Sequence, residues 1–254
     1  MKTIKSEAEI RVLARGGEIL ARILHTLASH ASIGKNILDL EQEARLLCKK
    51  YNVESAFLGY QPEGASHPYP AAACFSVNDV VVHGTPTDRA LRSGDILKID
   101  MGVLCEGLYT DAALTVAIGS ISPVAKKLIQ STKEALSAGI KAVKVGGHIG
   151  DIGYAVERQA KKDGFFVLRG LTGHGVGHEL HEDPVIFNYG KRHSGMPIKE
   201  GMVLAIEPMF SVSSLDVVQN NDESYSSADK SLTAHFEHTI AVTSKGVVVL
   251  TMAN

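Results

Sequence analysis

Residues Asp95–Ile118, DILKIDMGVLCEGLYTDAALTVAI, combine two apolar, β-branched runs with one short break. The runs Asp95–Val103 and Leu108–Ile118 are typical of strands, because such residues pack well on a pleated surface. Glu106-Gly107 lies between them and is typical of a tight turn. The sequence therefore predicts a β-hairpin in the middle of the chain.

Helices and further strands are expected on both sides of this hairpin. Ser6 and Glu9 match the capping box that opens a helix, and apolar residues recur at helical spacing from Ile10 to Leu27. The other expected helices are about Leu38–Tyr51, Pro123–Val143 and Ile152–Lys161. The other expected strands are Val80–Val82, Val203–Glu207, His238–Thr243 and Val247–Leu250, and the polar segment 212–230 is expected to be an exposed hairpin loop.

The order of these elements repeats once. Two helices followed by strands occur before residue 120 and again after it, although no repeat of residues is visible. This order predicts an α+β fold with pseudo-twofold symmetry. Its halves would span about 1–120 and 121–254 of a single domain, with a site between them.

The composition fits a soluble protein with a substantial core. Of 254 residues, 44% are hydrophobic, and a net charge of −2 argues against a nucleic-acid-binding protein that works by bulk positive charge. The sequence has no apolar run long enough to span a membrane, and no secretory signal is expected at its start. Cys48, Cys74 and Cys105 are odd in number and widely spaced, which indicates reduced thiols and a cytoplasmic location.

Three acidic residues, Asp100, Glu207 and Glu237, interrupt apolar, strand-like runs. A buried carboxylate normally takes up a proton or finds a cationic partner, because removing its charge from water is costly. Lys98 is expected to point to the other face of its strand, and no arginine lies near Glu207 or Glu237 in the sequence. A divalent cation is therefore the simplest partner for these acids.

Two more residues extend this set. Asp111 is expected close to Asp100 across the hairpin, where two carboxylates would repel each other. His174 lies in the glycine-rich stretch Gly170–Gly177. One such residue alone is more often structural, but four carboxylates and one imidazole together suit two metal ions with shared ligands. The mainly oxygen ligands favour Mn, Fe or Co over a thiolate-type zinc site.

These residues stand within a longer series of motifs. In chain order, the motifs are Ser76–Gly84, Gly94–Asp100, Thr110-Asp111, Gly173–Gly177, Leu180–Pro184, Ile206–Met209 and Glu237–Thr239. In this order and spacing, the chain resembles the type I methionine aminopeptidases over nearly its whole length. The resemblance implies the pita-bread fold, in which a pseudo-twofold antiparallel sheet is covered by two pairs of helices.

The resemblance also implies roles for individual residues. Two divalent ions (Co, Mn, Fe or Zn) would be bound by Asp100, Asp111, His174, Glu207 and Glu237, with Asp111 and Glu237 bridging them. His83 and His181 would line the active site and contact the substrate, and Glu207 would also act in catalysis as a proton acceptor. The family's apolar methionine pocket corresponds to Tyr60, Tyr69 and Cys74.

The implied activity is removal of the initiator methionine from nascent polypeptides that have a small second residue. The implied protein is a monomer that comes into transient proximity with the ribosome and binds neither membrane nor nucleic acid. Proline-specific relatives share the five metal ligands, so a proline-directed peptidase stays an alternative, as does an inactive binding protein of the same fold. The 254 residues are expected to leave no room for the extra N-terminal domain of aminopeptidase P and prolidase.

Three features depart from the family's pattern. The loop from Tyr60 to Tyr69 is longer than in the commonest bacterial form, and His178 stands where a relative often has another residue. The chain has no Trp, so Tyr225 is expected where many relatives carry one. These departures concern the shape of the pocket, and the predicted metal ligands are all present.

Overall fold

Within residues 3–253, which the computed structural model describes, there are four helices close to the expected positions. Their bounds are α1 (Glu7–His30), α2 (Ile37–Tyr51), α3 (Pro123–Ala142) and α4 (Ile149–Asp163). Helix α1 begins as predicted, because the Ser6 hydroxyl accepts the backbone N–H of Glu9 and the Glu9 carboxylate accepts that of Ser6. None of these helices combines the length and the apolar character that crossing a membrane requires.

The two longest strands of the described chain form the predicted hairpin. The strands are β1 (Glu54–Ser55), β2 (Cys74–Val77), β3 (Val80–Val82), β4 (Ile96–Cys105), β5 (Leu108–Ala117), β6 (Phe166–Val167), β7 (Thr172–Gly175), β8 (Glu182–Phe187), β9 (Val203–Ile206), β10 (Met209–Ser211), β11 (Val217–Gln219), β12 (Tyr225–Ser227), β13 (Thr233–His235), β14 (Glu237–Thr243) and β15 (Gly246–Val249). The predicted hairpin is β4–β5, and the predicted C-terminal strands are β9, β14 and β15.

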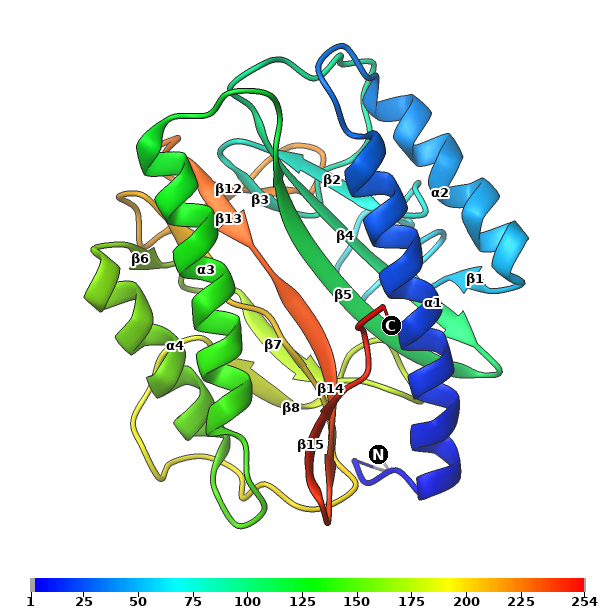
Figure 1. Cartoon of the computed structure of the whole chain (residues 1–254), viewed down its shortest axis with the longest axis vertical. Coiled ribbons are helices and arrows are strands. Elements are labelled where there is room, and N and C mark those ends of the chain that lie inside the picture. The colour runs from blue at the N-terminus through cyan, green and yellow to red at the C-terminus, as the bar shows by residue number, and fades with distance from the viewer. Residues whose placement is uncertain (1–2, 254) are drawn as a thin grey trace.

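Nine strands form one antiparallel sheet, with the main order β1-β4-β5-β14-β9-β7-β8, while β2 pairs with β4 and β15 with β14. Strands β4 and β5 come from the first half of the chain and β14, β9 and β7 from the second, so the pairing of β5 with β14 joins the halves. Figure 1 shows helices α1 and α2 beside the first half and α3 and α4 beside the second. The prediction of an α+β fold with two pairs of helices on an antiparallel sheet is confirmed.

Helix α1 covers one face of the central hairpin. A Cβ atom added to Gly16 of this helix would lie 3.0 Å from Cβ of Cys105 and 3.4 Å from the hydroxyl oxygen of Thr110. Glycine at this position therefore allows the helix to approach β4 and β5 closely. Because successive side chains of a strand alternate between faces, Asp111 points away from α1. The candidate site lies on that opposite face of the sheet.

Apolar side chains fill the space between the helices and the sheet. Leu20 of α1 and Leu40 of α2 share one buried cluster with Ile99 of β4. Ile152 of α4 shares a second cluster with Ile206 of β9. Both helix pairs are therefore anchored to the strands that carry the candidate site, so the backbone under the site is held by the core.

Segment 212–230 corrects one prediction. It contains a hairpin, β11–β12, but this hairpin is not simply an exposed loop, because β12 also pairs with β3. Ser226 and Ser227 are buried at this junction. The partner strand lies more than 140 residues earlier in the chain, so the polar character of the segment alone gave no indication of the pairing.

Candidate active site

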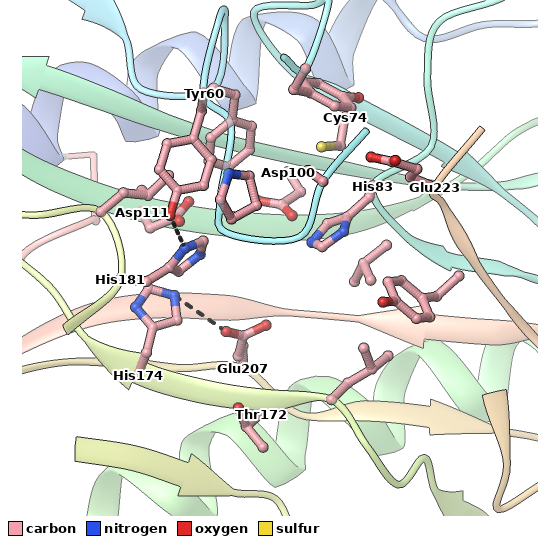
Figure 2. Close-up of a pocket in the computed structure, with 18 of the residues that line it drawn as sticks. Tyr60, Cys74, His83, Asp100, Asp111, Thr172, His174, His181, Glu207 and Glu223 are labelled. Atoms are coloured by element: carbon pink, nitrogen blue, oxygen red, sulfur yellow. Dashed lines mark hydrogen bonds and ion pairs between the residues drawn. The ribbon is translucent and has the colours of Figure 1, made fainter. Parts of the chain in front are cut away.

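Five neighbouring strands bring the predicted metal ligands together. Asp100 lies on β4, Asp111 on β5 and Glu237 on β14. His174 lies on β7, and Glu207 directly follows β9. Figure 2 shows four of these side chains, Asp100, Asp111, His174 and Glu207, pointing into a common space. All five are buried, and the fold brings these four carboxylates and one imidazole from distant parts of the chain close together.

The register of the sheet explains why the acids are close. Asp100 pairs with Ala113 of β5, and Asp111 pairs with Gly102 of β4. The two aspartates are thus diagonal neighbours on one face of the hairpin. Glu237 of β14 also pairs with Ala113, which places Asp100 and Glu237 on either side of this small residue.

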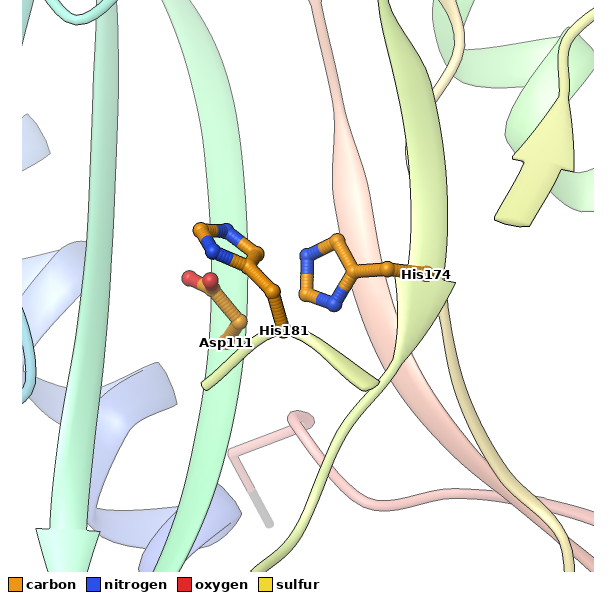
Figure 3. A group of neighbouring side chains, drawn as sticks. All are labelled: Asp111, His174 and His181. Atoms are coloured by element: carbon orange, nitrogen blue, oxygen red, sulfur yellow. The ribbon is translucent and has the colours of Figure 1, made fainter. Parts of the chain in front are cut away.

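The ligand atoms form overlapping groups that fit divalent cations. One potential ligand atom from each of Asp100, Asp111 and Glu237 lies within 4.8 Å of the others, and the same holds for His174, Glu207 and Glu237. Asp111, His174 and His181 form another such group, which Figure 3 shows. Glu237 is shared by the first two groups, as expected for a ligand between two ions.

Several of the buried oxygens have no hydrogen-bond partner. They are Oδ1 of Asp100, Oδ1 of Asp111 and Oε1 of Glu237. A buried acceptor without a partner loses its interactions with water and gains none from the protein. These three oxygens are hard ligands of the kind that divalent cations bind, so the donor set fits a metal centre.

The electrostatics point in the same direction. Burial, together with the charge of Asp111, raises the pKa of Asp100 far above the ordinary aspartate value. Burial raises the pKa of Asp111 to about 7. The pKa of Glu207 and that of Glu237 are also raised, first by burial and then by the neighbouring carboxylates. Without a cation these carboxylates therefore hold their protons more strongly than free acids do, and a divalent ion would compete with those protons.

His174 is oriented for metal binding. Its Nδ1 lies 2.9 Å from the backbone oxygen of Gly175, so this nitrogen donates its proton there. The lone pair of Nε2 is then directed into the site, where it lies 3.5 Å from Oε1 of Glu207. Burial lowers the pKa of His174 to about 4, which keeps the ring neutral. A neutral imidazole fixed in this way through its second nitrogen is a typical metal ligand.

Lys98 corrects a detail of the sequence prediction. Residues two apart on a strand share a face, so Lys98 and Asp100 leave the same side of β4 and not opposite sides. The Lys98 amine nevertheless does not neutralise the acids, because it donates to the carbonyl oxygens of Asn78 at 2.7 Å and Thr233 at 3.3 Å. The conclusion that no lysine of β4 balances the carboxylates therefore holds for a different reason.

A cavity of about 740 Å³ opens beside the acids. Its lining includes all five residues expected at the substrate: Tyr60, Tyr69, Cys74, His83 and His181. The Tyr60 hydroxyl is hydrogen-bonded to Nδ1 of His181 at 2.8 Å, and Tyr69 donates to the backbone oxygen of Gly84 at 3.0 Å. Both rings are partly removed from water inside the cavity, which lowers the pKa of His83 and lowers that of His181 to about 3, so the charged form of each ring is disfavoured.

The mouth of the cavity contains two of the features that depart from the family's pattern. The long loop between Tyr60 and Tyr69 reaches across to the β11–β12 turn, where the N–H of Ser66 donates to the Glu223 carboxylate at 2.8 Å. Tyr225 of β12 lines the cavity, with its ring centre 5.8 Å from that of His83. Strand β12 thus supplies an aromatic ring to the lining of the cavity.

A family model described as metallopeptidase family M24 matches residues 11–244. The chain belongs to this family. Membership in the M24 metallopeptidases implies a divalent metal cofactor, and the partnerless carboxylate oxygens agree with that.

Relatives of the same length narrow the relationship within family M24. A methionine aminopeptidase from Aquifex aeolicus is 40% identical over 252 residues, which cover 97% of each chain. The crystal structure of a methionine aminopeptidase from Thermotoga maritima has 39% identity and a TM-score of 0.94, and the match covers 98% of each chain. A methionine aminopeptidase structure from Rickettsia prowazekii has 34% identity and the same TM-score of 0.94. The predicted resemblance and the predicted pita-bread fold are confirmed.

Solved structures of proline-directed peptidases are more distant, and their likeness to this chain shows the fold alone. A prolidase structure from Pyrococcus furiosus has a TM-score of 0.78 and 23% identity, and the match covers 66% of that longer chain.

Two residues that contact Glu207 were not expected at the candidate site from the sequence. Nε2 of the buried His235 lies 3.3 Å from Oε2 of Glu207, and Asn188 donates to the backbone oxygen of Glu207 at 2.9 Å. His235 lies two residues before Glu237 within strand-like sequence, so its spacing was a usable signal. No comparable signal marks Asn188, which reaches Glu207 only through the packing of the chain.

A second group of potential ligands has a structural explanation. One ligand atom from each of His148, Asp151 and His193 lies within 4.8 Å of the others. One carboxylate oxygen of Asp151 accepts the N–H of His148 at 2.9 Å, and the other accepts that of His193 at 2.8 Å. Asp151 therefore caps the start of α4, where the helix dipole disfavours a cation.

Proposed function

We propose that this M24 member removes methionine from the N-terminus of polypeptides by metal-assisted hydrolysis of the first peptide bond. The observation that carries the proposal is the placement of four buried carboxylates and one neutral imidazole at the wall of the cavity. Full-length similarity to methionine aminopeptidases of several bacteria supports the same activity. The buried carboxylates account for the metal requirement. The residues that line the cavity account for the preference for methionine.

We assign two divalent ions to the site, drawn from Co, Mn, Fe and Zn. Asp100 would bind one ion, His174 and Glu207 the other, and Asp111 and Glu237 both; the sharing of Glu237 between two ligand groups supports this arrangement. When bound, such ions polarise a carbonyl and lower the pKa of water toward ~7. Oδ1 of Asp100 and Oε1 of Glu237, which lack partners in the protein, would gain them.

Three side chains would take part in the proton and charge movements. Glu207 would accept a proton from the attacking water and return it to the departing amine, as a positioned carboxylate can. His181, held by Tyr60, would donate a hydrogen bond to the developing oxyanion. His83 would donate a hydrogen bond near the scissile amide. The free α-amino group of the substrate would bind at the metal end, which explains action at the chain terminus.

The pocket suits an unbranched thioether. Tyr60 and Tyr69 supply aromatic surface to the cavity, and the buried Cys74 supplies a small, polarisable thiol. A methionine side chain is polarisable and makes favourable contacts with aromatic rings. We propose that these three residues form the methionine pocket.

The biological setting is proposed on the same basis. We infer that the substrates are nascent polypeptides with a small second residue, and that the protein acts in the cytoplasm, as a monomer, in transient proximity to the ribosome. We also propose a single catalytic domain for residues 1–254, because strands of both halves contribute ligands to one site.

The test is metal-dependent hydrolysis of the peptide Met-Ala-Ser, with an Ala-Pro peptide as the control. We expect methionine release that a chelator abolishes and that added Mn or Co restores. Faster cleavage of the Ala-Pro peptide would favour a proline-directed peptidase. Metal binding without cleavage of either peptide would favour a binding protein.

A further inference from the structure

Lys5 connects the start of the described chain to the active-site region. Its backbone N–H donates to the carbonyl oxygen of Gly201 at 2.7 Å, which fixes the segment before α1 against the turn that leads to β9. Its side chain has no exposed surface, and its amine forms an ion pair with the carboxylate of Glu182, whose side chain is 2% exposed. A lysine is rarely buried to this degree unless it is paired, so the contact is specific.

Glu182 uses its second carboxylate oxygen to shape the adjoining turn. Oε1 accepts the backbone N–H of His178 at 2.6 Å and that of Glu179 at 3.1 Å. The carboxylate therefore closes residues 178–182 into a turn while Lys5 holds the carboxylate from the other side. His181 is part of this turn and directly precedes Glu182.

Gly177 leaves room for the lysine. Its φ of +148° is unfavourable for residues with a side chain, and a Cβ atom there would lie 2.3 Å from Cε of Lys5. The carbonyl oxygen of Gly177 accepts the N–H of Tyr109 on β5 at 2.7 Å. The turn is thus tied to the sheet at one end and to Lys5 through Glu182 at the other.

The position of His181 depends on this turn. Its ring centre lies 4.5 Å from that of His174, and its Nδ1 is hydrogen-bonded to the Tyr60 hydroxyl. Lys5 is not among the residues that line the cavity. A change at Lys5 would therefore reach the cavity indirectly, and the ion pair with Glu182 gives it a path through the turn.

We propose that Lys5 is a positioning residue, which sets the place of His181 in the cavity through the buried ion pair with Glu182. The inference rests on the proposed function, in which His181 acts on the transition state. A buried ion pair adds little net stability over an apolar pair, but it holds one geometry, because removing either partner leaves an uncompensated charge. The pair is thus suited to defining the turn.

The test compares Lys5→Met with the wild type after metal loading. Displacing His181 should lower kcat by between about 10-fold and 100-fold, because errors of position near 1 Å cost up to ~100-fold. KM should change less than about threefold, since the contact is made in the transition state. Metal content should stay at the wild-type value. Hydrogen exchange of residues 177–183 should become faster, because the N–H groups of His178 and Glu179 lose a fixed acceptor.

Two control variants separate positioning from general destabilisation. Arg15→Met removes an exposed ion pair with Glu106, and Leu128→Ala creates a cavity in the core under α3. Leu128→Ala should lower the melting temperature and Arg15→Met should barely change it. Neither should alter kcat by more than about twofold at a temperature where the protein is folded, nor the exchange of residues 177–183.

A double variant keeps the test decisive if Lys5→Met folds poorly. Lys5→Met/Glu182→Gln removes both charges together, so no buried charge is left without a partner. We expect the same loss of kcat and the same faster exchange as in the single variant. Wild-type kcat and wild-type exchange in the double variant would overturn the proposal. A wild-type protein without methionine release would instead overturn the proposed function, while the exchange measurement would still report on the turn.

Discussion

Asp95 and Asp100, just before and within one strand, are two contrasting kinds of buried aspartate. Asp95 lies just before β4 and is 6% exposed, while Asp100 lies within β4 and is 8% exposed. Burial acts on both carboxylates in the same direction, toward a higher pKa. The pKa of Asp95 is nevertheless lowered, whereas that of Asp100 is raised far above the ordinary value.

The difference lies in what the chain provides around each carboxylate. Asp95 accepts hydrogen bonds from the backbone N–H of Arg92, the amide of Asn78 and the guanidinium of Arg89, at 2.8 to 2.9 Å. Asp100 faces other carboxylates, and its Oδ1 has no partner. Burial alone therefore does not mark an acid as part of a functional site. An acid that is buried without a cation from the protein beside it does point to such a site.

Glu237→Ala is the strongest way to test this contrast, because Glu237 belongs to two of the three ligand groups at the site. We expect both metal content and methionine release to be lost, the latter by on the order of 1000-fold or more. Metal analysis after gel filtration and a peptide assay measure the two effects. The matched control is Glu157→Ala on α4, which breaks an i,i+4 pair with Lys161. Full activity of Glu237→Ala would show that the bridging assignment is wrong.

His181→Ala sharpens the contrast by removing a cavity residue that is not an acid. We expect kcat to fall by about 100-fold to 1000-fold, as for loss of one donor to an oxyanion. Metal content should stay nearly unchanged, because the carboxylates remain, and His83→Ala should behave in the same way with a smaller loss. His193→Ala, at an exposed histidine, is the control. Loss of metal in His181→Ala would make His181 a ligand.

The pH dependence of metal affinity distinguishes the two kinds of aspartate in solution. Asp111, with a pKa of about 7, must lose its proton before it binds a cation. Affinity should therefore fall as pH falls through 7, by about tenfold between pH 8 and pH 6 from this group alone. Calorimetry in buffers of different ionisation enthalpy should detect the released protons. Affinity that is constant over this range would contradict the raised pKa.

Asp95→Asn should have the smallest effect of these variants, and it should lower the stability of the fold without changing metal binding or activity. The lowered pKa of Asp95 means that its interactions stabilise the fold above the unfolded-state pKa of about 3.9, and that this stability is lost as pH falls through the lower folded-state value. We expect the variant to lose about 1 to 3 kcal/mol of unfolding free energy at pH 7. Urea titrations should show the difference from wild type shrinking in acid. Metal content and kcat of the folded variant should match the wild type.

Much of the fold was predictable because its signals are local. The capping box at Ser6 predicts one helix start, and the apolar, β-branched runs on either side of Glu106-Gly107 predict one hairpin, each from a few neighbouring residues. The glycine-rich strand β7 gave no such signal. Gly173 is needed there because a Cβ atom would lie 2.4 Å from the backbone oxygen of Ala205 on β9, a contact that exists only in the folded sheet.

The candidate site was predictable in its acids and less so in their surroundings. An acid within an apolar run is conspicuous, which is why Asp100, Glu207 and Glu237 could be singled out. The partnership of Lys5 with Glu182 joins residues 177 positions apart. Neither residue looks unusual in its own segment, so only the folded chain reveals the pair.

The burial of Cys74 has a consequence for the durability of the pocket. Burial and the nearby charge of Asp100 raise the pKa of this thiol well above its ordinary value. Alkylating agents and peroxides attack thiolates, and at neutral pH this sulfur keeps its proton. The proposed methionine pocket thus has a soft sulfur surface that gives oxidants little to react with.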